Sequence, residues 1–389
     1  MGILKSQEVT LNQIGIHLLD SIKLKSTLER FRRQLSKPDL LPRLILAHLE
    51  AVRSRLHTFD YALVDISDIQ KRYSRFQEGL AQVRDGSCGE IGIGYWFLNI
   101  FGVNRSGSVF TPLLSQLYSF AMETISENQE ILNGIRRIIT TIHKAFVWVI
   151  DRGGDRDQII RLLIRMKQFF IIRLMSRRNL EYKGKSMSIH RISREVPLLF
   201  RYEARRIYKN RLKIEAYDIG VVSVQYIDPY THLVLEQPLY LVVMKGIGKG
   251  YSWFLVNSHF TDLQEIAQDT FRRYGYRWHI EEYHRHIKDQ FNLENIQLRK
   301  YDRLQTMLMI MAIVMYLLYT ETRSLHQRLL IENKINTIAK TNAWELVGFV
   351  YYKIGTIFQI LIATVVVRAF IPLKKCILDN VNQLALGLV

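Results

Sequence analysis

Two short apolar runs that each end on an aspartate constrain the fold of this chain most. "FDYALVDISD" (59–68) places Asp65 directly after "YALV", and "AFVWVIDRGGD" (145–155) places Asp151 directly after "FVWVI". A helical pattern, "DQIIRLLIRMKQ" (157–168), and a further apolar run, "FFIIRLM" (169–175), follow the second aspartate. Buried strands that alternate with helices are typical of an α/β domain.

The segments before and between these two runs also have predictable secondary structure. "GSCGEIGIGYWFLNIFGVN" (86–104) alternates and is rich in glycine and aromatics, which predicts two strands of a hairpin. Residues 111–144 contain helical patterning. Residues 1–57 have helical periodicity on both sides of a break at "SKPDLLP" (36–42), so they form either a DNA-contacting domain or a plain helical cap.

A basic, β-rich block interrupts the α/β pattern. Residues 158–214 hold 16 Lys and Arg against 3 Glu. Strands are predicted at 212–228, 239–246 and 252–258. Beyond this block, 262–291 is predicted as two helices broken near Gly275, and 295–389 as mostly helical.

The charge of the whole chain indicates its class of partner. A formal net charge of +18 and a pI of about 9.8 favour a polyanion such as nucleic acid. Cys88 and Cys376 make no disulfide framework, and the N-terminal residues lack the apolar core of a signal peptide, so a cytoplasmic protein is expected. The apolar runs 307–319 and 355–367 are shorter than the roughly 20 residues that cross a bilayer, so we expect buried helices and no membrane.

The segment "RRYGYRWHIEEYHRHIKDQFNLE" (272–294) keeps a carboxylate among cations. On a helix, Tyr274, Arg277, Glu281 and Lys288 fall within roughly a 60° arc, because each residue turns the helix by about 100°. The far side carries apolar residues, namely Ile280, Tyr283, Ile287 and Phe291. The plain alternative is a surface helix in which Glu281 pairs with Arg277 or Arg285, with Glu282 solvated at its rim.

Three acids in this pattern point to metal-assisted phosphodiester chemistry. That chemistry needs carboxylates that converge on a pair of divalent ions, and Mg²⁺ and Mn²⁺ prefer oxygen ligands. Asp65 and Asp151 follow buried strands, where an aspartate is costly unless it is paired or bound to a metal. The alternative is that each only starts a turn. Asp60, Asp68 and Asp155 compete for the acid roles; alternation points Asp68 to the opposite face, and Asp155 lies beyond the Gly-Gly turn, where it is less well anchored.

The segment also contains two histidines that lie close to the arc. His284 and His286 are separated by two positions, so they do not share one side of a helix. We interpret them as surface residues or phosphate contacts and not as metal ligands.

The residues at these spacings resemble a known family. Tyr274, Arg277, Glu281 and Lys288 match the YREK signature of DDE transposases of the bacterial insertion-sequence type. "VDISDI" and "VIDRGGD", the latter followed by "FFIIRL", resemble the segments around the family's first and second catalytic aspartates. The resemblance extends over about residues 59–325.

The resemblance implies a fold with named boundaries. Residues 58–176 and 259–325 would be the two parts of an RNase H-like catalytic core. Residues 177–258 would be a basic, β-rich insertion between them. Residues 1–57 and 326–389 would be helical regions at either end.

It also implies a reaction. Asp65, Asp151 and Glu281 would be the catalytic metal ligands for two Mg²⁺ or Mn²⁺ ions. Tyr274, Arg277 and Lys288 would contact DNA phosphates, with Arg285 as a further DNA-binding residue. Trp253 would stack on a flipped base, against the plain alternative of a strand aromatic.

The expected partner is double-stranded DNA, both the ends of the element and the target. The protein would act in the cytoplasm at the nucleoid, as a homodimer when bound to DNA, without a small-molecule substrate. Two alternatives stay open. One is an inactive, degenerate transposase that only binds DNA. The other is a non-enzymatic basic scaffold protein, in which the three acids would lie far apart.

Overall fold

The computed structural model describes residues 2–326, apart from 19, 55–58, 85, 87–88, 108, 123–125, 209–210, 229, 232–238 and 247–249. The part of the predicted C-terminal helical region beyond His326, including the apolar run 355–367, lies outside the described residues. So do Cys88 and Cys376.

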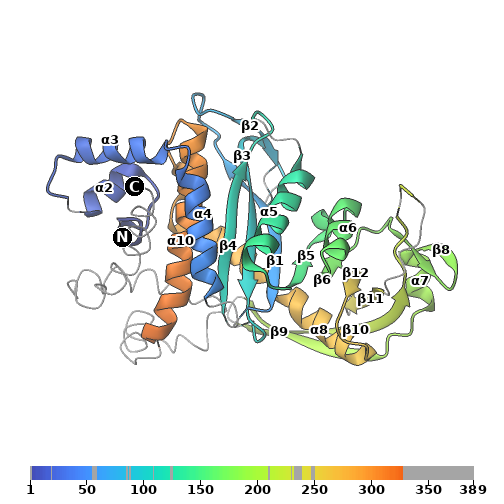
Figure 1. Cartoon of the computed structure of the whole chain (residues 1–389). Helices are drawn as coiled ribbons and strands as arrows, with labels where there is room; N and C mark the ends of the chain where they lie inside the picture. Colours follow the sequence, from blue (N-terminus) through green and yellow to red (C-terminus); the bar gives the residue numbers. More distant parts are fainter. Residues whose placement is uncertain are drawn as a thin grey trace.

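A mixed sheet forms the centre of the molecule (Figure 1). Its first strands are β1 (Tyr61–Gln70), β2 (Ala81–Arg84), β3 (Ile91–Val103), β4 (Phe110–Tyr118), β5 (Val147–Ile150) and β6 (Phe169–Arg173). They lie in the order β2-β3-β1-β5-β6, with β4 on β3. β3 is antiparallel to β1, whereas β5 is parallel to both β1 and β6. The α/β class predicted from the apolar runs is therefore confirmed.

The second half of the sheet comes from the basic block. Its strands are β7 (Asn179–Tyr182), β8 (Lys185–Ser188), β9 (Phe200–Tyr208), β10 (Arg211–Val224), β11 (Leu239–Gly246) and β12 (Tyr251–Asn257). β12 pairs antiparallel with β6, and β11, β10 and β9 follow outward, while β7 and β8 form a separate pair. Six strands thus lie between β6 and the next long helix.

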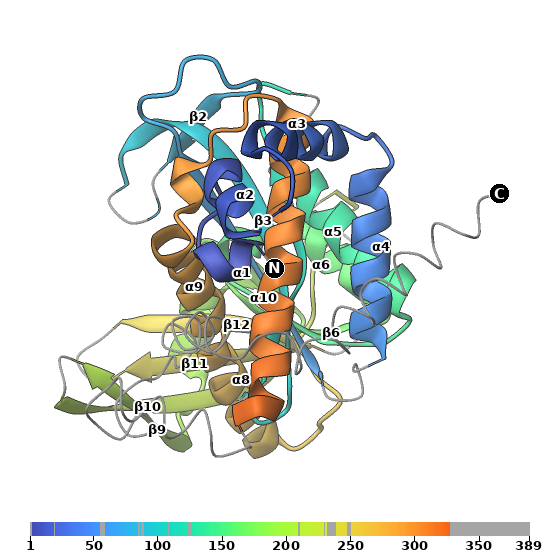
Figure 2. The ribbon, with the colours of Figure 1, turned by 90° about the vertical axis from the view of Figure 1, so that its left-hand side faces the viewer.

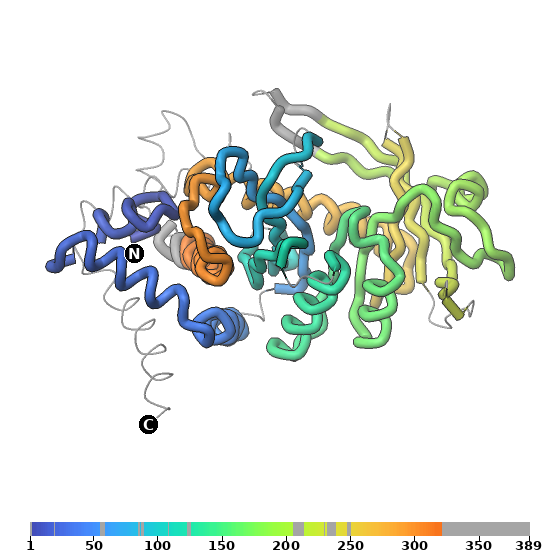
Figure 3. Tube along the Cα trace, turned by 90° about the horizontal axis from the view of Figure 1, so that it is seen from above, coloured from blue at the N-terminus to red at the C-terminus, as the bar shows by residue number. Residues whose placement is uncertain are grey.

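Helices cover both faces of the sheet. They are α1 (Gly2–Ser6), α2 (Leu11–Leu18), α3 (Leu24–Leu35), α4 (Leu40–Arg53), α5 (Glu127–Ile142), α6 (Asp157–Arg165), α7 (Ile189–Glu195), α8 (Leu263–Tyr276), α9 (Trp278–Arg285) and α10 (Tyr301–His326). Short helical turns span Arg152–Gly154, His286–Gln290 and Leu293–Asn295. The N-terminal helices lie at one end of the molecule and the β7–β8 pair with α7 at the other (Figures 1 and 3).

Two apolar cores follow from the alternation of strand residues. Leu63 of β1 packs into the core that holds α8 and α9, whereas Ala62 and Val64 pack into the core that holds α4, α5 and α6. Successive side chains of a strand point to opposite faces. Asp65 therefore belongs to the face that α9 covers.

The helix α10 joins the two cores beside the edge strand β4 (Figures 1 and 2). Met309 packs into one core and Met311 into the other. Within the described residues, α10 is the one helix long and apolar enough to cross a membrane, over Tyr301–Thr320, and 67% of its most apolar stretch is buried inside the protein. It lies where the run 307–319 predicted a buried helix.

Two predicted elements are wrong. Residues 91–103 form one long strand and not a hairpin, and 110–118 form strand β4 where helical patterning was expected. A Cβ on Gly94 would lie 2.0 Å from the carbonyl oxygen of Ile69, so this glycine permits close approach of β1 instead of making a turn. β4 is buried on both sides, which removes the alternation that identifies a strand.

Candidate active site

The register of β1 and β5 places two of the predicted acids side by side. Val64 and Ile150 are the last pair of the parallel ladder, and Asp151 is the first residue after β5. The prediction that Asp65 also follows a strand is wrong, because β1 continues to Gln70 and pairs with β3 on both sides of this residue. Neighbouring strands lie about 4.8 Å apart. The two carboxylates therefore leave the sheet at adjacent points.

Helix α9 brings the third acid to the same place. Arg277 lies at the junction of α8 and α9 and forms an ion pair with Glu281, one helical turn further along. Its Nη1 lies 3.7 Å from Oδ2 of Asp65. Tyr274 donates a hydrogen bond of 2.8 Å to Oδ1 of Asp151. We call Asp65, Asp151, Glu281 and the guanidinium of Arg277 the acid cluster.

The local sequence explains why α9 faces this edge of the sheet. Ile280 and Tyr283 are fully buried against β1 and β3. Asn99, which pairs with Asp65 across the β1–β3 ladder, donates a hydrogen bond of 2.8 Å to His284 if the facing ring nitrogen is the unprotonated one. The apolar side of α9 is thus fixed on the sheet, which leaves Glu281 on Arg277, close enough to Asp65 for its charge to act on that carboxyl.

Burial and the opposing charge of Arg277 dominate the electrostatics of the two aspartates. Burial raises the pKa of Asp65 to about 7, and the charges of Asp151 and Glu281 add to the rise while Arg277 opposes it. Burial acts in the same direction on Asp151, but Arg277, hydrogen bonds from the backbone and Tyr274, and the charge of Arg173 hold its pKa below the usual value. The charges of all three acids in turn raise the pKa of Arg277, despite its own burial, so its guanidinium stays protonated.

The donor set fits a hard divalent cation, although a guanidinium lies among the acids here. Within the described part of the chain, no three His, Cys, Asp or Glu side chains already surround a common point suited to a metal ion. The acids instead converge on Arg277, whose buried Nε donates to no acceptor among the described residues. Carboxylate oxygens are the ligands that Mg²⁺ and Mn²⁺ prefer.

Arg173 joins the cluster although the sequence analysis did not single it out. It ends β6, the strand next to β5, and its Nη1 lies 3.6 Å from Oδ1 of Asp151. The same group donates a hydrogen bond of 3.2 Å to the hydroxyl of Tyr274. The sequence could have indicated Arg173, because a charged residue directly after an apolar run, here "FFII", is the same pattern that indicated Asp65 and Asp151.

Lys288 does not share one helix face with Tyr274, Arg277 and Glu281 as predicted, but lies beside Asp68, three residues beyond Asp65 on β1. The helix is interrupted between Tyr276 and Trp278, and 286–290 form a π-helical turn. Nζ of Lys288 lies 3.2 Å from Oδ1 of Asp68 and 3.6 Å from Oε1 of Glu294. Beyond Val64, β1 has no β5 partner, so Lys288 meets Asp68 along this open edge. Lys288 therefore forms ion pairs with Asp68 and Glu294, and Asp68 is the nearer of the two.

Several neighbouring residues differ from the prediction. His284 and His286 are buried, with 8% and 1% of their surface exposed, so the interpretation as surface residues is wrong. Glu282 is also buried and forms an ion pair with Arg285. Asp155 is well anchored, because it is buried and accepts hydrogen bonds from Arg178 and a backbone amide.

Trp253 lies away from the acid cluster. Its neighbour on β12, Phe254, packs on Tyr274 with ring centroids 4.7 Å apart, so Trp253 points to the other face. There its Nε1 donates a hydrogen bond of 2.6 Å to Ser193. Nothing at this position tests base stacking, and that role stays a prediction.

Comparison with known proteins identifies the family. No curated protein matches the chain. The family model described as the transposase DDE domain matches residues 115–317, more than half of the 389 residues. The matched region includes Asp151, Glu281 and the residues around them, and it begins after Asp65. This chain belongs to the transposase DDE domain family.

Proposed function

We propose that the protein is a transposase of the insertion-sequence type, with the YREK signature, that cuts DNA at the ends of its own element and joins the freed 3′ ends to a target. The observation that carries the proposal is the convergence of Asp65, Asp151 and Glu281 on one cation. These acids come from two adjacent strands and a helix more than 120 residues further along the chain. A scaffold protein has no need to gather them.

Asp65, Asp151 and Glu281 would hold two Mg²⁺ or Mn²⁺ ions. Such ions activate water as a nucleophile and stabilise the leaving oxygen of a phosphodiester. The raised pKa of Asp65 supports the assignment, because a buried carboxylate beside two others gains most from an added positive charge. The acids themselves would fix where the scissile phosphate lies.

Arg277 would exchange partners when DNA binds. Without DNA, its guanidinium neutralises Asp65 and Glu281. Arginine can bind a phosphate with two parallel hydrogen bonds, and Nε of Arg277 has no acceptor among the described residues. Tyr274, whose hydroxyl donates to Asp151 without DNA, would donate to the same phosphate when DNA binds. Lys288 and Arg285 would contact the backbone further along the strand.

The strand order supports an RNase H-like core. β4, β3 and β1 form an antiparallel unit, and β5 and β6 continue it in parallel. Strands β7–β12 would be the insertion between the second and third acids. Duplex DNA at the element ends and at the target would be the partner, bound by a homodimer in the cytoplasm at the nucleoid, and the net charge of +18 favours such a partner.

Cleavage of a duplex that contains the DNA flanking the coding region tests the proposal. We expect Mg²⁺-dependent nicking by the unaltered protein. Asp65→Asn, Asp151→Asn and Glu281→Gln should each lower the rate by at least about a hundredfold, because even the partners of metal ligands typically contribute ten- to a hundredfold. Duplex binding, measured without divalent ions, should persist.

The matched control is Asp289→Asn, an exposed acid close to Glu281 in sequence, which should cleave like the unaltered protein. Full cleavage by any of the three acid variants would remove that residue from the site. Binding without cleavage by the unaltered protein would identify an inactive copy.

A further inference from the structure

A basic groove lies beyond the acid cluster, between two segments that flank the β1 end of the sheet. One wall is the loop 71–77 after β1, and the other is the segment 294–299 before α10, with Arg32 of α3 and Arg303 of α10 closing it. The cavity has a volume of about 970 Å³. Figure 2 shows the loop between β1 and β2 beside α3 and the start of α10.

The lining is strongly cationic. Glu294 is the one acid among the lining residues. Six lining residues are lysine or arginine, namely Arg32, Lys71, Arg72, Arg75, Arg299 and Arg303. Glu294 already lies 3.6 Å from Lys288, which offsets its charge. The field in the groove therefore attracts a polyanion.

Two aromatic side chains of the loop are exposed in the same groove. Tyr73 and Phe76 expose 96% and 79% of their surface, the largest values for large apolar side chains in the described part of the chain. Leaving such rings in water forfeits the burial energy of an aromatic side chain, about 1.5–3 kcal/mol. Aromatic rings in a cationic groove are typical of proteins that stack the bases of single strands.

The base of the loop is fixed while its aromatic residues are exposed. Lys71 donates a hydrogen bond of 2.7 Å to the carbonyl of Ile296, and Gln77 donates one of 2.7 Å to the carbonyl of Leu298. The amide of Glu78 donates one of 2.8 Å to Arg299. Both walls are thus tied together, so Tyr73 and Phe76 are presented on a rigid support. Binding then costs less ordering entropy.

The groove lies further along the chain direction of β1 than the acid cluster. Gln70, the last residue of β1, lines it, and Lys71, the next residue, is six residues from Asp65, or about 20 Å at 3.3 Å per residue. Stacked nucleotides rise about 3.4 Å each, so a strand that starts at the acids reaches the groove within roughly six nucleotides. Lys288 and Asp68 lie between the two.

We propose that this groove binds an unpaired stretch of a DNA strand, with phosphates on Arg75 and Arg299 and bases stacked on Tyr73 and Phe76. The proposal rests on the proposed function for its choice of DNA. It assigns the site to the strand that becomes unpaired next to the cleavage point.

Binding of a short fluorescent single-stranded oligonucleotide, followed by anisotropy in EDTA, tests the groove without any cleavage. Tyr73→Ala and Phe76→Ala should each weaken binding about tenfold, since each base–aromatic stack contributes that order. Tyr73→Phe keeps the ring and should bind like the unaltered protein. Arg75→Ala should weaken binding and lower the salt dependence by about one ion.

The matched control is Tyr230→Ala, because Tyr230 is also exposed, at 67%, and also lies against an arginine, but outside the groove. It should bind the strand normally. A 2-aminopurine base in the oligonucleotide should be quenched by the unaltered protein and by Tyr73→Phe, and less by Tyr73→Ala.

Three results would overturn the proposal. Normal strand binding by both alanine variants would remove the aromatics from the site. If the alanine variants lost as much affinity for a duplex of the same sequence as for the single strand, the aromatic side chains would not stack on unpaired bases. A change in self-association instead of DNA binding would make the surface a protein contact. Because strand binding is measured in EDTA and needs neither metal ions nor cleavage, failure of the groove is distinguishable from failure of the active site, which the cleavage assay reports.

Discussion

Arg277 is the residue that makes the acid cluster stable in the absence of DNA. Two adjacent aspartates and a glutamate at one sheet edge repel one another, and burial strengthens the repulsion. The guanidinium of Arg277 offsets this repulsion by pairing with Asp65 and Glu281. A buried charge of this kind costs several kcal/mol when its partner is removed. The same charge occupies the region that a divalent cation would need.

We therefore expect Arg277→Gln to bind Mn²⁺ more tightly than the unaltered protein. Removing one positive charge from among the carboxylates should strengthen binding at least about tenfold, or ~1.4 kcal/mol. Calorimetry or electron paramagnetic resonance on the DNA-free protein measures this. Arg285→Gln is the matched control, because Arg285 pairs with Glu282 outside the cluster and should leave Mn²⁺ affinity unchanged. Equal or weaker affinity in Arg277→Gln would show that the arginine does not compete with the ion.

His284 gives the stability of the protein a dependence on pH. Burial lowers its pKa to about 3, and the charges of Lys288 and Arg277 act in the same direction. The unfolded chain has an ordinary imidazole, with a pKa of about 6.5. Between pH 6.5 and about 3, the unfolded state therefore binds one more proton here, so the free energy of unfolding falls as the pH falls, by up to about 1.4 kcal/mol per pH unit.

His284→Gln should be less stable than the unaltered protein at pH 7.5, because it loses ring packing on Phe97. It should also lose less stability on acidification, with a slope between pH 6 and 5 that is shallower by up to about 1.4 kcal/mol per unit. Urea unfolding at each pH measures both. Parallel pH profiles for the two proteins would mean that His284 is not held neutral.

At this scale the sequence indicated that Asp65 and Asp151 need partners, but it did not predict the burial of Glu282, His284 and His286. Asp65 and Asp151 were identifiable because a carboxylate directly after a buried apolar run needs a partner. Arg173 carried the same signal but was passed over, and its role appears only once β6 is placed beside β5. His284 looked exposed because it sits among charged residues, yet the interruptions in the helix turn it toward Asn99.

Among the elements, strands were harder to predict than helices. β4 and the outer half of β3 differ from their predictions because glycine and unbroken apolar runs carry no unique period. The pairing of β12 with β6 joins residues about 80 positions apart, which no local pattern specifies. The helices α5, α6 and α8 follow their apolar periodicity, and Ser126 and Asp262 cap α5 and α8 through their side chains.

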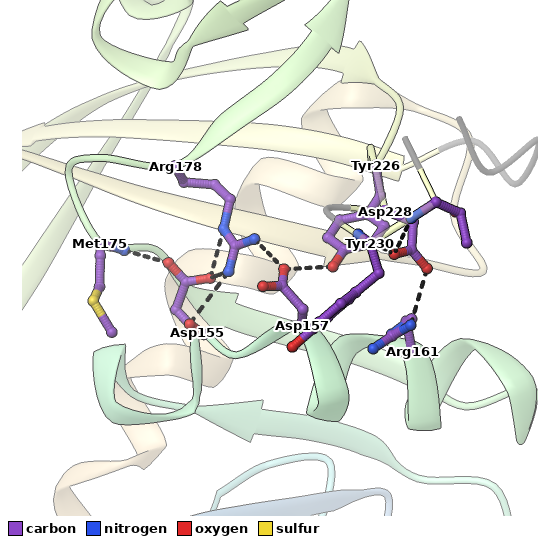
Figure 4. A network of polar contacts seen from close by, with 9 residues as sticks. Asp155, Asp157, Arg161, Met175, Arg178, Tyr226, Asp228 and Tyr230 are labelled. Carbon is purple, nitrogen blue, oxygen red and sulfur yellow. Dashed lines mark hydrogen bonds and ion pairs between the residues drawn. The ribbon is translucent and has the colours of Figure 1, made fainter. Parts of the chain in front are cut away.

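One polar network joins the strands β7–β12 to the loop after β5 (Figure 4). Arg178, between β6 and β7, donates hydrogen bonds of 2.9 and 2.5 Å to Asp155 and forms an ion pair with Asp157. Tyr226, after β10, donates a hydrogen bond of 2.5 Å to Asp157. Asp155 has only 2% of its side chain exposed. Asp151 lies four residues before this anchor, in the same loop.

Arg178→Ala should lower the free energy of unfolding by about 3 kcal/mol, because it leaves the Asp155 carboxylate buried without its cation. Urea denaturation measures the loss. Arg156→Ala is the matched control from the same loop: its ion pair with Glu127 is about one-third exposed, so about 1 kcal/mol or less is expected. A loss for Arg178→Ala no larger than for the control would remove this network from the supports of the fold.

The whole molecule places its chemistry at the middle of one continuous sheet. The acid cluster lies where β5 ends beside the middle of β1, with the N-terminal helices and α10 to one side and the basic strands β7–β12 to the other (Figures 1 and 3). The basic groove begins at Gln70, the last residue of β1, five residues beyond Asp65. The sequence predicted the class of this architecture from its apolar runs, but the joining of the two halves depends on contacts between distant segments.

The most direct test of the account is the anomalous scattering of Mn²⁺ in crystals of the protein bound to DNA from the ends of its element. The account predicts Mn²⁺ bounded by the carboxylates of Asp65, Asp151 and Glu281, with Arg277 turned from the acids to a phosphate. Mn²⁺ bound by other residues, or Arg277 still paired with Asp65 and Glu281 beside bound DNA, would contradict it.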